Sequence, residues 1–354
     1  MKYIVLVILL VSFTLLNCEV ERSRYFYPIL DYSDETNLSG GGVMVYLYRQ
    51  DDQARNVPPG LLKLKLEVGV SGNWSFDCEN EWQFEKGKYA INLPLSFEIQ
   101  DCKLYGINDD INLEVYNENR SRQFYFNFQM LRRWEKYDFG FTFTGNYFKY
   151  NDPIDIKWLI SKTDTVYAGG RSLGPGLTFQ YNTLDNQYFP LKGLKVGFDL
   201  QTFSEALSSD YTYECYSLET VCFIKLARLT TWGTKLNFIV SAGDTPYQEL
   251  PSLGNKLRIF KGGQFSDKYL MSLITEIRSF PWDTGKLMRW GVVVFAEAGQ
   301  VKADYDDFRL KDFVYGAGIG IRYLLDIDEL FTIRLDGGLF KDQISIDFSS
   351  REAF

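Results

Sequence analysis

The chain has 354 residues, of which 45% are hydrophobic and 17% aromatic, and its formal net charge is -8. This length suits two ordinary domains or one large barrel, and the negative charge argues against nucleic acid as a partner, because a phosphate backbone needs a basic surface. The chain contains no histidine, which excludes histidine-based catalytic triads and histidine-ligated metal sites. The remaining residues show no nucleophile–base pair, so we predict neither an enzyme nor a cofactor or metal site.

The first 18 residues have the pattern of a secretory signal. Lys2 precedes an apolar run over residues 4–16, which is too short to span a bilayer as a helix, since that takes about 20 residues. We expect cleavage near Cys18 and a mature domain over residues 19–354. The alternative is a lipoprotein signal with lipidation of Cys18, because residues 15–18 partly resemble a lipoprotein cleavage box.

Four cysteines follow Cys18, and an even number in an exported chain permits disulfides. They are Cys78, Cys102, Cys215 and Cys222. The last two would lie too far apart along one strand to be bridged. We therefore favour a Cys78–Cys102 pair, with free cysteines as the alternative.

From about residue 24 to the end, apolar and polar residues alternate with a period of two, which predicts strands with one apolar and one polar face. We place sixteen strands near 24–31, 41–49, 61–70, 73–83, 88–98, 121–131, 136–149, 172–182, 193–204, 212–225, 232–243, 267–279, 288–298, 313–324, 329–339 and 343–351. The pattern predicts an all-β protein, a transmembrane antiparallel up-and-down β-barrel of about 16 strands in a bacterial outer membrane. Counts of fourteen or twelve stay open, because residues 70–120 are poorly resolved by pattern.

The connections differ in length in the way that such barrels require. If the first strand runs outward, the short turns at 183–192 and 325–329 lie in the periplasm. The longer links at 150–171, 244–266 and 299–312 then lie outside, as is usual for outer-membrane barrels.

The inward faces of the late strands carry glycines and charges. Gly316, Gly318 and Gly320 leave room in the lumen, so we expect another segment to pack beside them. Alternation also turns six charged residues inward: Glu276, Arg278, Glu297, Arg322, Arg334 and Asp336. The general expectation for such charges is that they line a watery lumen.

The end of the chain has apolar and aromatic residues at alternate positions, as in the signal by which barrels are delivered to the outer-membrane assembly machinery. The residues concerned are Gln343, Ile346, Phe348 and Phe354. They predict that the protein is a client of that machinery, although any last strand of a barrel would have this pattern.

Four motifs occur in the order and spacing of the BamA/TamA-type bacterial surface antigen barrels. They are residues 181–193 (YNTLDNQYFPLKG), 257–270 (LRIFKGGQFSDKYL), 295–299 (FAEAG) and the terminal EAF. The resemblance covers about residues 173–354, and residues 27–32 resemble more loosely the opening strand of short family members. It implies a sixteen-stranded outer-membrane barrel whose sixth external loop, here near 244–266, folds back into the lumen.

The resemblance also implies site residues. The family's loop carries a Val/Leu-Arg-Gly-Phe tetrapeptide whose arginine meets an acidic residue of the inner wall. Here the tetrapeptide places Arg258 and Phe260 at the matching positions, with Ile259 in place of the glycine. The acidic partner implied by the resemblance is Glu297, which alternation independently turns toward the lumen.

Two functions remain open from the sequence. Family members that assemble or export proteins carry periplasmic POTRA domains ahead of the barrel, and we expect none between Cys18 and the first strand. The chain would either aid insertion or translocation of proteins at the outer membrane, through a weak seam between its first and last strands, or be a structural barrel, pore or surface antigen without assembly activity. A soluble secreted β-protein is a third interpretation. The expected partners are outer-membrane lipid, the assembly machinery and other outer-membrane proteins.

Overall fold

The computed structural model describes residues 20–33, 37–50, 57, 59–105, 107, 115–152, 168–260, 262–282, 285, 287–327, 330–341 and 343–350. The expected signal segment, the lipidation candidate Cys18 and the terminal Phe354 lie outside the described residues.

No helix in the described ranges is long and apolar enough to cross a membrane.

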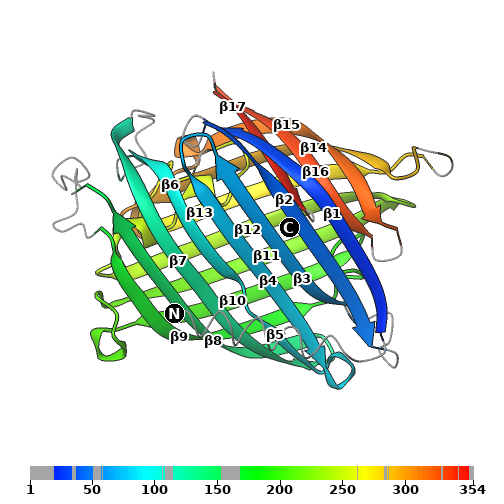
Figure 1. Ribbon diagram of the computed structural model, residues 1–354, viewed down its shortest axis with the longest axis horizontal. Coiled ribbons are helices and arrows are strands. Elements are labelled where there is room, and N and C mark those ends of the chain that lie inside the picture. Colours follow the sequence, from blue (N-terminus) through cyan, green and yellow to red (C-terminus); the bar gives the residue numbers. More distant parts are fainter. Residues whose placement is uncertain are drawn as a thin grey trace.

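One antiparallel sheet of seventeen strands makes up the structure. The strands are β1 (Val20–Ser33), β2 (Asn37–Gln50), β3 (Gly60–Gly69), β4 (Trp74–Phe84), β5 (Tyr89–Asn92), β6 (Leu95–Tyr105), β7 (Val115–Trp134), β8 (Tyr137–Tyr150), β9 (Gly170–Asn182), β10 (Gly193–Phe203), β11 (Tyr213–Ala227), β12 (Thr230–Gly243), β13 (Tyr269–Ser279), β14 (Trp290–Lys302), β15 (Val314–Asp326), β16 (Phe331–Phe340) and β17 (Gln343–Ser350). They curve into a barrel (Figure 1), so the predicted fold class is confirmed.

Strands β5 and β6 share one position in this sheet, because both pair with β4 on one side and with β7 on the other. Leu93 and Pro94 separate them, and a proline has no backbone N–H to donate to a neighbouring strand. Seventeen strands therefore fill sixteen positions, the number that the sequence predicts. The single strand predicted near 88–98 corresponds to β5 together with the start of β6.

Successive strands alternate in direction, so the connections fall at two ends. The turn end is the end that contains the connections at residues 183–192, 228–229, 280–289 and 327–330. The loop end is the opposite end, with the connections at residues 151–169, 204–212, 244–268 and 303–313. β1 begins and β17 finishes at the turn end. The long links predicted near 150–171, 244–266 and 299–312 all fall at the loop end, and the turns predicted at 183–192 and 325–329 fall at the turn end, although short links such as residues 70–73 also fall at the loop end.

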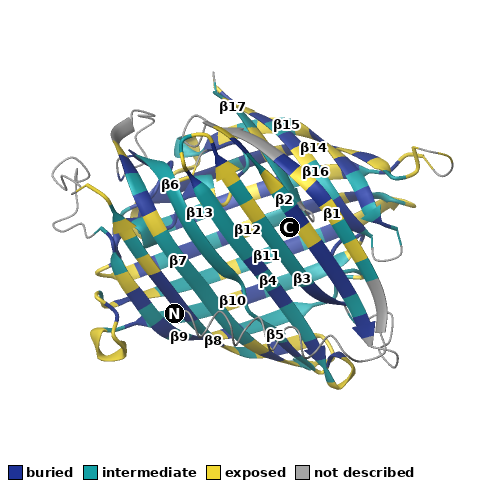
Figure 2. Ribbon diagram, viewed as in Figure 1, coloured by how far each residue is buried: buried dark blue, intermediate teal, exposed yellow. Residues whose placement is uncertain are grey.

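Exposed and buried residues alternate along the strands (Figure 2). In β14, Val292 and Val294 are exposed on the outside, whereas Val293 and Phe295 are buried inside. Exposed aromatic side chains lie toward both ends: Trp134, Tyr137, Trp232 and Trp290 at the turn end, and Tyr147 and Tyr315 at the loop end. An apolar outer face with aromatic residues near its edge is the surface that a membrane barrel presents to lipid.

The main apolar core lies inside the barrel. Residues of the 244–268 segment pack there against the walls formed by β12–β16. The segment contributes Leu253, Leu257, Ile259, Phe260 and Phe265, and the walls contribute Ile239, Leu270, Ile274, Val293, Phe295, Val301, Val314 and Phe340. The segment between β12 and β13 therefore folds into the lumen.

The first and last strands meet at a seam. Register pairs run from β1 through to β17, and in the described ranges none joins β17 back to β1. Side chains meet across the seam instead, where the rings of Tyr27 and Phe348 lie edge to face with centroids 6.2 Å apart. The Phe348 ring is partly buried against the cluster that contains Tyr27, whereas Ile344 and Ile346, at alternate positions of the same strand, are exposed.

The expected disulfide is also wrong, since Cys78, Cys102, Cys215 and Cys222 are all free. Strand register gives the reason. Cys78 of β4 lies opposite Leu95 of β6, whereas Cys102 of β6 lies several residues farther along, opposite Asn119 of β7. A disulfide needs Cα atoms within about 7 Å, and this register holds the two cysteines apart.

Candidate functional site

The segment over residues 244–268 is a compact loop held by its own hydrogen bonds. Ser252 Oγ donates to Gln264 O (2.8 Å), Leu253 N donates to Phe265 O (3.1 Å), and Asp267 N donates to Pro251 O (3.1 Å). These bonds close the loop near its base. The residues between them, which include Arg258 to Phe260, are thereby presented to the barrel wall as one unit.

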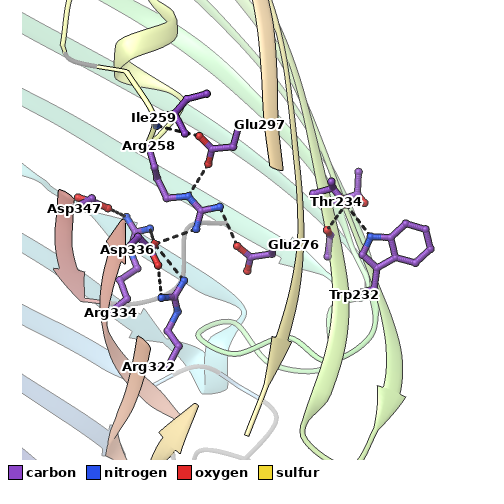
Figure 3. Close-up of polar contacts among 12 residues, drawn as sticks. Trp232, Thr234, Arg258, Ile259, Glu276, Glu297, Arg322, Arg334, Asp336 and Asp347 are labelled. Atoms are coloured by element: carbon purple, nitrogen blue, oxygen red, sulfur yellow. Dashed lines mark hydrogen bonds and ion pairs between the residues drawn. The ribbon is translucent and has the colours of Figure 1, made fainter. Parts of the chain in front are cut away.

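Arg258 projects from this loop onto three carboxylates (Figure 3). Its Nε donates to Glu297 Oε1 of β14 (2.6 Å), its Nη1 donates to Asp336 Oδ2 of β16 (3.0 Å), and its Nη2 lies 3.2 Å from Glu276 Oε2 of β13. The guanidinium carbon also lies 3.7 Å from the centroid of the Phe295 ring. Charge-assisted bonds of this kind, together with the cation–π contact, fix both the position and the orientation of the guanidinium.

The structure thus brings Arg258 and Glu297 together, and adds two partners that alternation could assign only to the lumen. Glu297 Oε2 also accepts from Ile259 N (3.3 Å). Burial alone would lower the pKa of Arg258, but the carboxylates of Glu276, Glu297 and Asp336 outweigh burial and raise that pKa. The arginine therefore stays charged in its buried position.

Further charges connect this contact to the last strand. Asp336 also accepts from Arg322 Nη1 of β15 (2.5 Å) and from Arg334 Nη1 (2.8 Å). Arg334 in turn lies 2.6 Å from Asp347 of β17. A chain of ion pairs therefore runs from the loop through β16 to β17. Removing Arg258 would leave the buried carboxylates of Glu276 and Glu297 without its charge, which is costly, whereas Asp336 would keep Arg322 and Arg334.

Arg278, which alternation also turns inward, contacts a different segment. Its guanidinium stacks over Phe189 (4.2 Å to the ring centroid), and its Nη2 donates to Pro190 O (2.7 Å). Both partners belong to the 183–192 turn. Alternation correctly predicts the face on which Arg278 lies but not its position along the barrel axis.

Of the three glycines predicted to leave room in the lumen, Gly316 has Ile259 of the loop beside it, whereas Gly318 faces Phe295 and Gly320 faces Asp336 and Arg322 of the wall itself. A Cβ atom added at Gly316 or at Gly338 would lie 2.9 Å from the Ile259 side chain. The chain has isoleucine where the resembling tetrapeptide has glycine, and two wall glycines make space for it. The neighbouring Phe260 packs against Phe340 and Phe265, with ring centroids 4.7 and 5.1 Å away.

The first part of the loop is attached to a different wall. Tyr247 OH donates to Tyr105 O at the end of β6 (2.9 Å) and accepts from Tyr105 N (3.1 Å). Gln248 makes two bonds of 3.0 Å to the backbone of Gly169, and Glu249 accepts from the Asn146 amide of β8. The loop therefore crosses the lumen, from the wall formed by β6–β9 to the wall formed by β13–β16.

Sequence reasoning misses this second attachment. The partners are a tyrosine, a glutamine and a glutamate in a row, a composition that is typical of any exposed loop. Burial raises the pKa of Glu249 to about 7, with the Asn146 bond acting in the opposite direction. A buried carboxylate with a neutral partner is a signal that only the folded structure provides.

Ion pairs of a more hydrated kind line the remaining lumen. Lys63 pairs with Glu79 (2.8 Å), and Glu219 pairs with both Lys195 (3.1 Å) and Lys235 (2.8 Å). These side chains are partly exposed, in contrast to the buried Arg258 network.

In the part of the chain that the structure describes, no group of three or more histidine, cysteine or acidic residues is arranged to hold a metal ion.

Comparison with known proteins establishes the fold. No protein-family model matches the sequence, and no curated protein matches it by sequence. BamA from Haemophilus ducreyi lacking POTRA domains 1-3 aligns with a TM-score of 0.54 at 15% identity, covering 94% of this chain and 69% of that one. CdiB from Acinetobacter baumannii aligns with a TM-score of 0.53 at 12% identity, covering 93% of this chain and 58% of CdiB. The chain therefore spans less than two thirds of CdiB, and it shares the barrel fold of both proteins.

Proposed function

We propose that the protein is an outer-membrane barrel of the BamA/TamA type that aids the insertion of other proteins into the outer membrane or their translocation across it. The observation that carries this proposal is the loop docked in the lumen by Arg258 on Glu276, Glu297 and Asp336. A loop anchored by buried ion pairs obstructs the lumen, so an open pore is the weaker interpretation. The likeness in fold to BamA and CdiB also supports this proposal.

The seam supplies a mechanism. β1 and β17 are the two ends of the register, and an unpaired strand edge can template a strand of another chain. The ion-pair chain through Arg334 to Asp347 ties β17 to the luminal loop. A client strand would add to the β1 or β17 edge, so the partners in this proposal are unfolded outer-membrane proteins and the surrounding lipid.

The test uses the full chain reconstituted in vesicles of phosphatidylethanolamine and phosphatidylglycerol, with a small urea-denatured outer-membrane barrel as the client. We expect the folded, fast-migrating form of the client to accumulate faster than in protein-free vesicles. A barrel whose seam is closed by a short thiol cross-linker between Tyr27→Cys and Phe348→Cys, two side chains that meet across the seam, with its native cysteines replaced by serine, is the matched control and should lose the effect. Client folding at the protein-free rate would overturn the proposal.

A pore without assembly activity is the second candidate function. The observation in its favour is the set of partly exposed ion pairs at Lys63, Lys195 and Lys235, which is the kind of lining that a water-filled passage has. Recording in planar bilayers separates the two candidates. Steady conductance that persists with the loop in place would favour the pore, whereas conductance that needs Arg258→Ala would favour the docked loop as a plug.

A further inference from the structure

The 183–192 turn, at the heart of the first sequence motif, packs inside the mouth of the barrel at the turn end. Phe189 and Leu191 are buried against Phe280 and Leu324, and Tyr188 is buried in a second cluster. Arg278 of β13 holds the turn in place by stacking on Phe189 and donating to Pro190 O. The turn therefore reaches across the mouth of the barrel from β9 and β10.

The motif builds this conformation through its polar residues. Asp185 Oδ1 accepts from Leu191 N (2.9 Å) and Lys192 N (3.2 Å), and Asn186 Oδ1 accepts from Tyr188 N (2.7 Å) and Phe189 N (2.8 Å). Side-chain bonds to nearby backbone N–H groups are the usual means by which Asp and Asn shape a turn. The turn is thus preorganised to present two aromatic rings to the lumen.

Gly193 closes the turn. It has φ +122°, and a Cβ there would lie 2.4 Å from Thr183 O. Both the backbone conformation and the close approach require glycine. The part of the 181–193 motif from Asp185 to Gly193 is therefore accounted for as a structural unit that holds Tyr188 and Phe189.

Tyr188 inserts between the two sides of the seam. The cluster that buries it contains Tyr27, Ile29, Val43, Val45, Leu47 and Leu61 from β1–β3, and Phe331, Ile333 and Phe348 from β16 and β17. The Tyr188 ring meets Phe331 edge to face at 5.5 Å, and its hydroxyl donates to Pro59 O (3.3 Å), next to the start of β3. One side chain therefore contacts both sides of the seam.

A second contact crosses the seam at the same end. Tyr25 OH of β1 donates to Asp326 Oδ2 at the end of β15 (2.6 Å). Together with the Tyr27–Phe348 contact, this means that side chains, rather than a continuous strand register, hold the turn end of the seam closed. Tyr188 is the member of this set that comes from the opposite side of the barrel.

We propose that the 183–192 turn is a latch that holds the β1–β17 seam closed from the turn end, with Tyr188 as the side chain that engages it. Withdrawal of the turn removes the ring from between β1–β3 and β16–β17 and lets the two edges separate. The latch is a feature of the barrel itself, and its purpose, control of the seam, rests on the proposed function.

Spin labels on the two sides of the seam test the latch. Phe26 of β1 and Ile346 of β17 are both exposed on the outer face, 76% and 67% respectively, so labels there leave the luminal cluster intact. The pair Phe26→Cys and Ile346→Cys is introduced into the full chain with its native cysteines replaced by serine. Double electron–electron resonance in the vesicles above then reports the distance across the seam.

We expect one short distance in the parent and an added population of longer distances in Tyr188→Ala. Tyr188→Phe keeps the ring and should resemble the parent. Trp134→Ala is the matched control, because it removes an exposed aromatic ring from another hairpin of the turn end, and it should leave the distance unchanged. A folded Tyr188→Ala barrel with the parent's distance distribution would overturn the latch. If Tyr188→Ala fails to fold, Tyr188→Leu, which keeps apolar volume but not the ring, is measured against the same criterion.

Failure of the latch and failure of the proposed function give different results. A seam that opens in Tyr188→Ala, in a barrel that does not accelerate client folding, supports the latch and removes the assembly role. An unchanged seam in a barrel that does accelerate client folding removes the latch and leaves the assembly role standing.

Discussion

The luminal loop is attached to two regions of the barrel by contacts of different kinds. On β13–β16, Arg258 is buried among Glu276, Glu297 and Asp336, and Ile259 fills the space over two glycines. On the side of β6–β9, the loop makes mainly neutral hydrogen bonds, to the backbone of Tyr105 and Gly169 and to the amide of Asn146.

This difference concerns how easily each attachment opens. Breaking a buried ion pair leaves uncompensated charges, whereas a hydrogen bond to a backbone group can be replaced by water when the loop moves. We therefore expect the β6–β9 attachment to open first, with the loop still anchored at Arg258. The loop would then behave as a flap hinged on the ion-pair network.

Substitution of Arg258 should have the largest effect. Arg258→Ala leaves the buried carboxylates of Glu276 and Glu297 without their arginine, a change that costs about 3–5 kcal/mol, while Asp336 keeps Arg322 and Arg334. The temperature at which the unboiled, fast-migrating band disappears should fall markedly. A double-mutant cycle with Glu297→Gln should show coupling, because the two side chains share one contact.

The matched control is Arg171→Ala, which breaks an exposed ion pair with Asp210. Exposed pairs contribute about 0–1 kcal/mol, so this variant should stay near the parent. Equal effects of the two arginine substitutions would refute the assignment of the β13–β16 wall as the strong attachment.

Adding a methyl group at Gly338 tests the packing of Ile259. The new Cβ of Gly338→Ala would meet Ile259 at 2.9 Å and Ser345 Oγ at 2.7 Å, and overpacking of this kind costs about 1–3 kcal/mol. The same thermal shift measures it. The double variant Gly338→Ala/Ile259→Ala should lose less stability than the sum of the two single losses, and strict additivity would contradict the contact.

Tyr247→Phe tests the weaker attachment. It leaves the buried N–H and C=O groups of Tyr105 without the tyrosine hydroxyl, at a cost of about 1–3 kcal/mol. Hydrogen exchange should accelerate over residues 244–252 and at the end of β6, while residues around Arg258 remain protected. Acceleration over the whole loop would show that the two attachments open together, which contradicts the flap.

The smallest expected effect is a pH dependence at Glu249. Its pKa is raised to about 7, so the folded state favours the protonated carboxyl. The stability that this protonation contributes is present at acid pH and is lost as the pH rises from the ordinary carboxyl pKa toward 7. The 244–252 attachment should therefore be weaker at pH 8 than at pH 5.

Glu249→Gln has no such proton to lose and should remove the dependence. Hydrogen exchange over residues 244–252, corrected for the intrinsic rate at each pH, measures both proteins. A pH dependence retained in the glutamine variant would assign the titration to another group.

The sequence by itself determined the barrel. A period-two pattern sustained over so many segments indicates which side chains face lipid and which face the lumen, and the number of strands fixes the end at which each connection lies. The glycines at 316, 318 and 320 also predicted that a segment would pack beside β15. The resemblance added the pairing of Arg258 with Glu297, because the tetrapeptide and the FAEAG motif are both local and recognisable.

Only the tertiary structure decided which luminal residues meet. Alternation places Arg278 and Arg322 on the same face, but the tilt and stagger of the strands set their height along the barrel. Arg322 therefore joins the Asp336 network, and Arg278 holds the 183–192 turn. Strand register likewise kept Cys78 and Cys102 apart.

The attachments that cross the lumen were beyond the sequence for the same reason. Tyr247 meets Tyr105, and Tyr188 meets Phe331, across 142 and 143 residues of chain. A period-two pattern describes the neighbours of a strand and carries no information about the opposite wall. The curvature of the sheet into a barrel is what brings these side chains together.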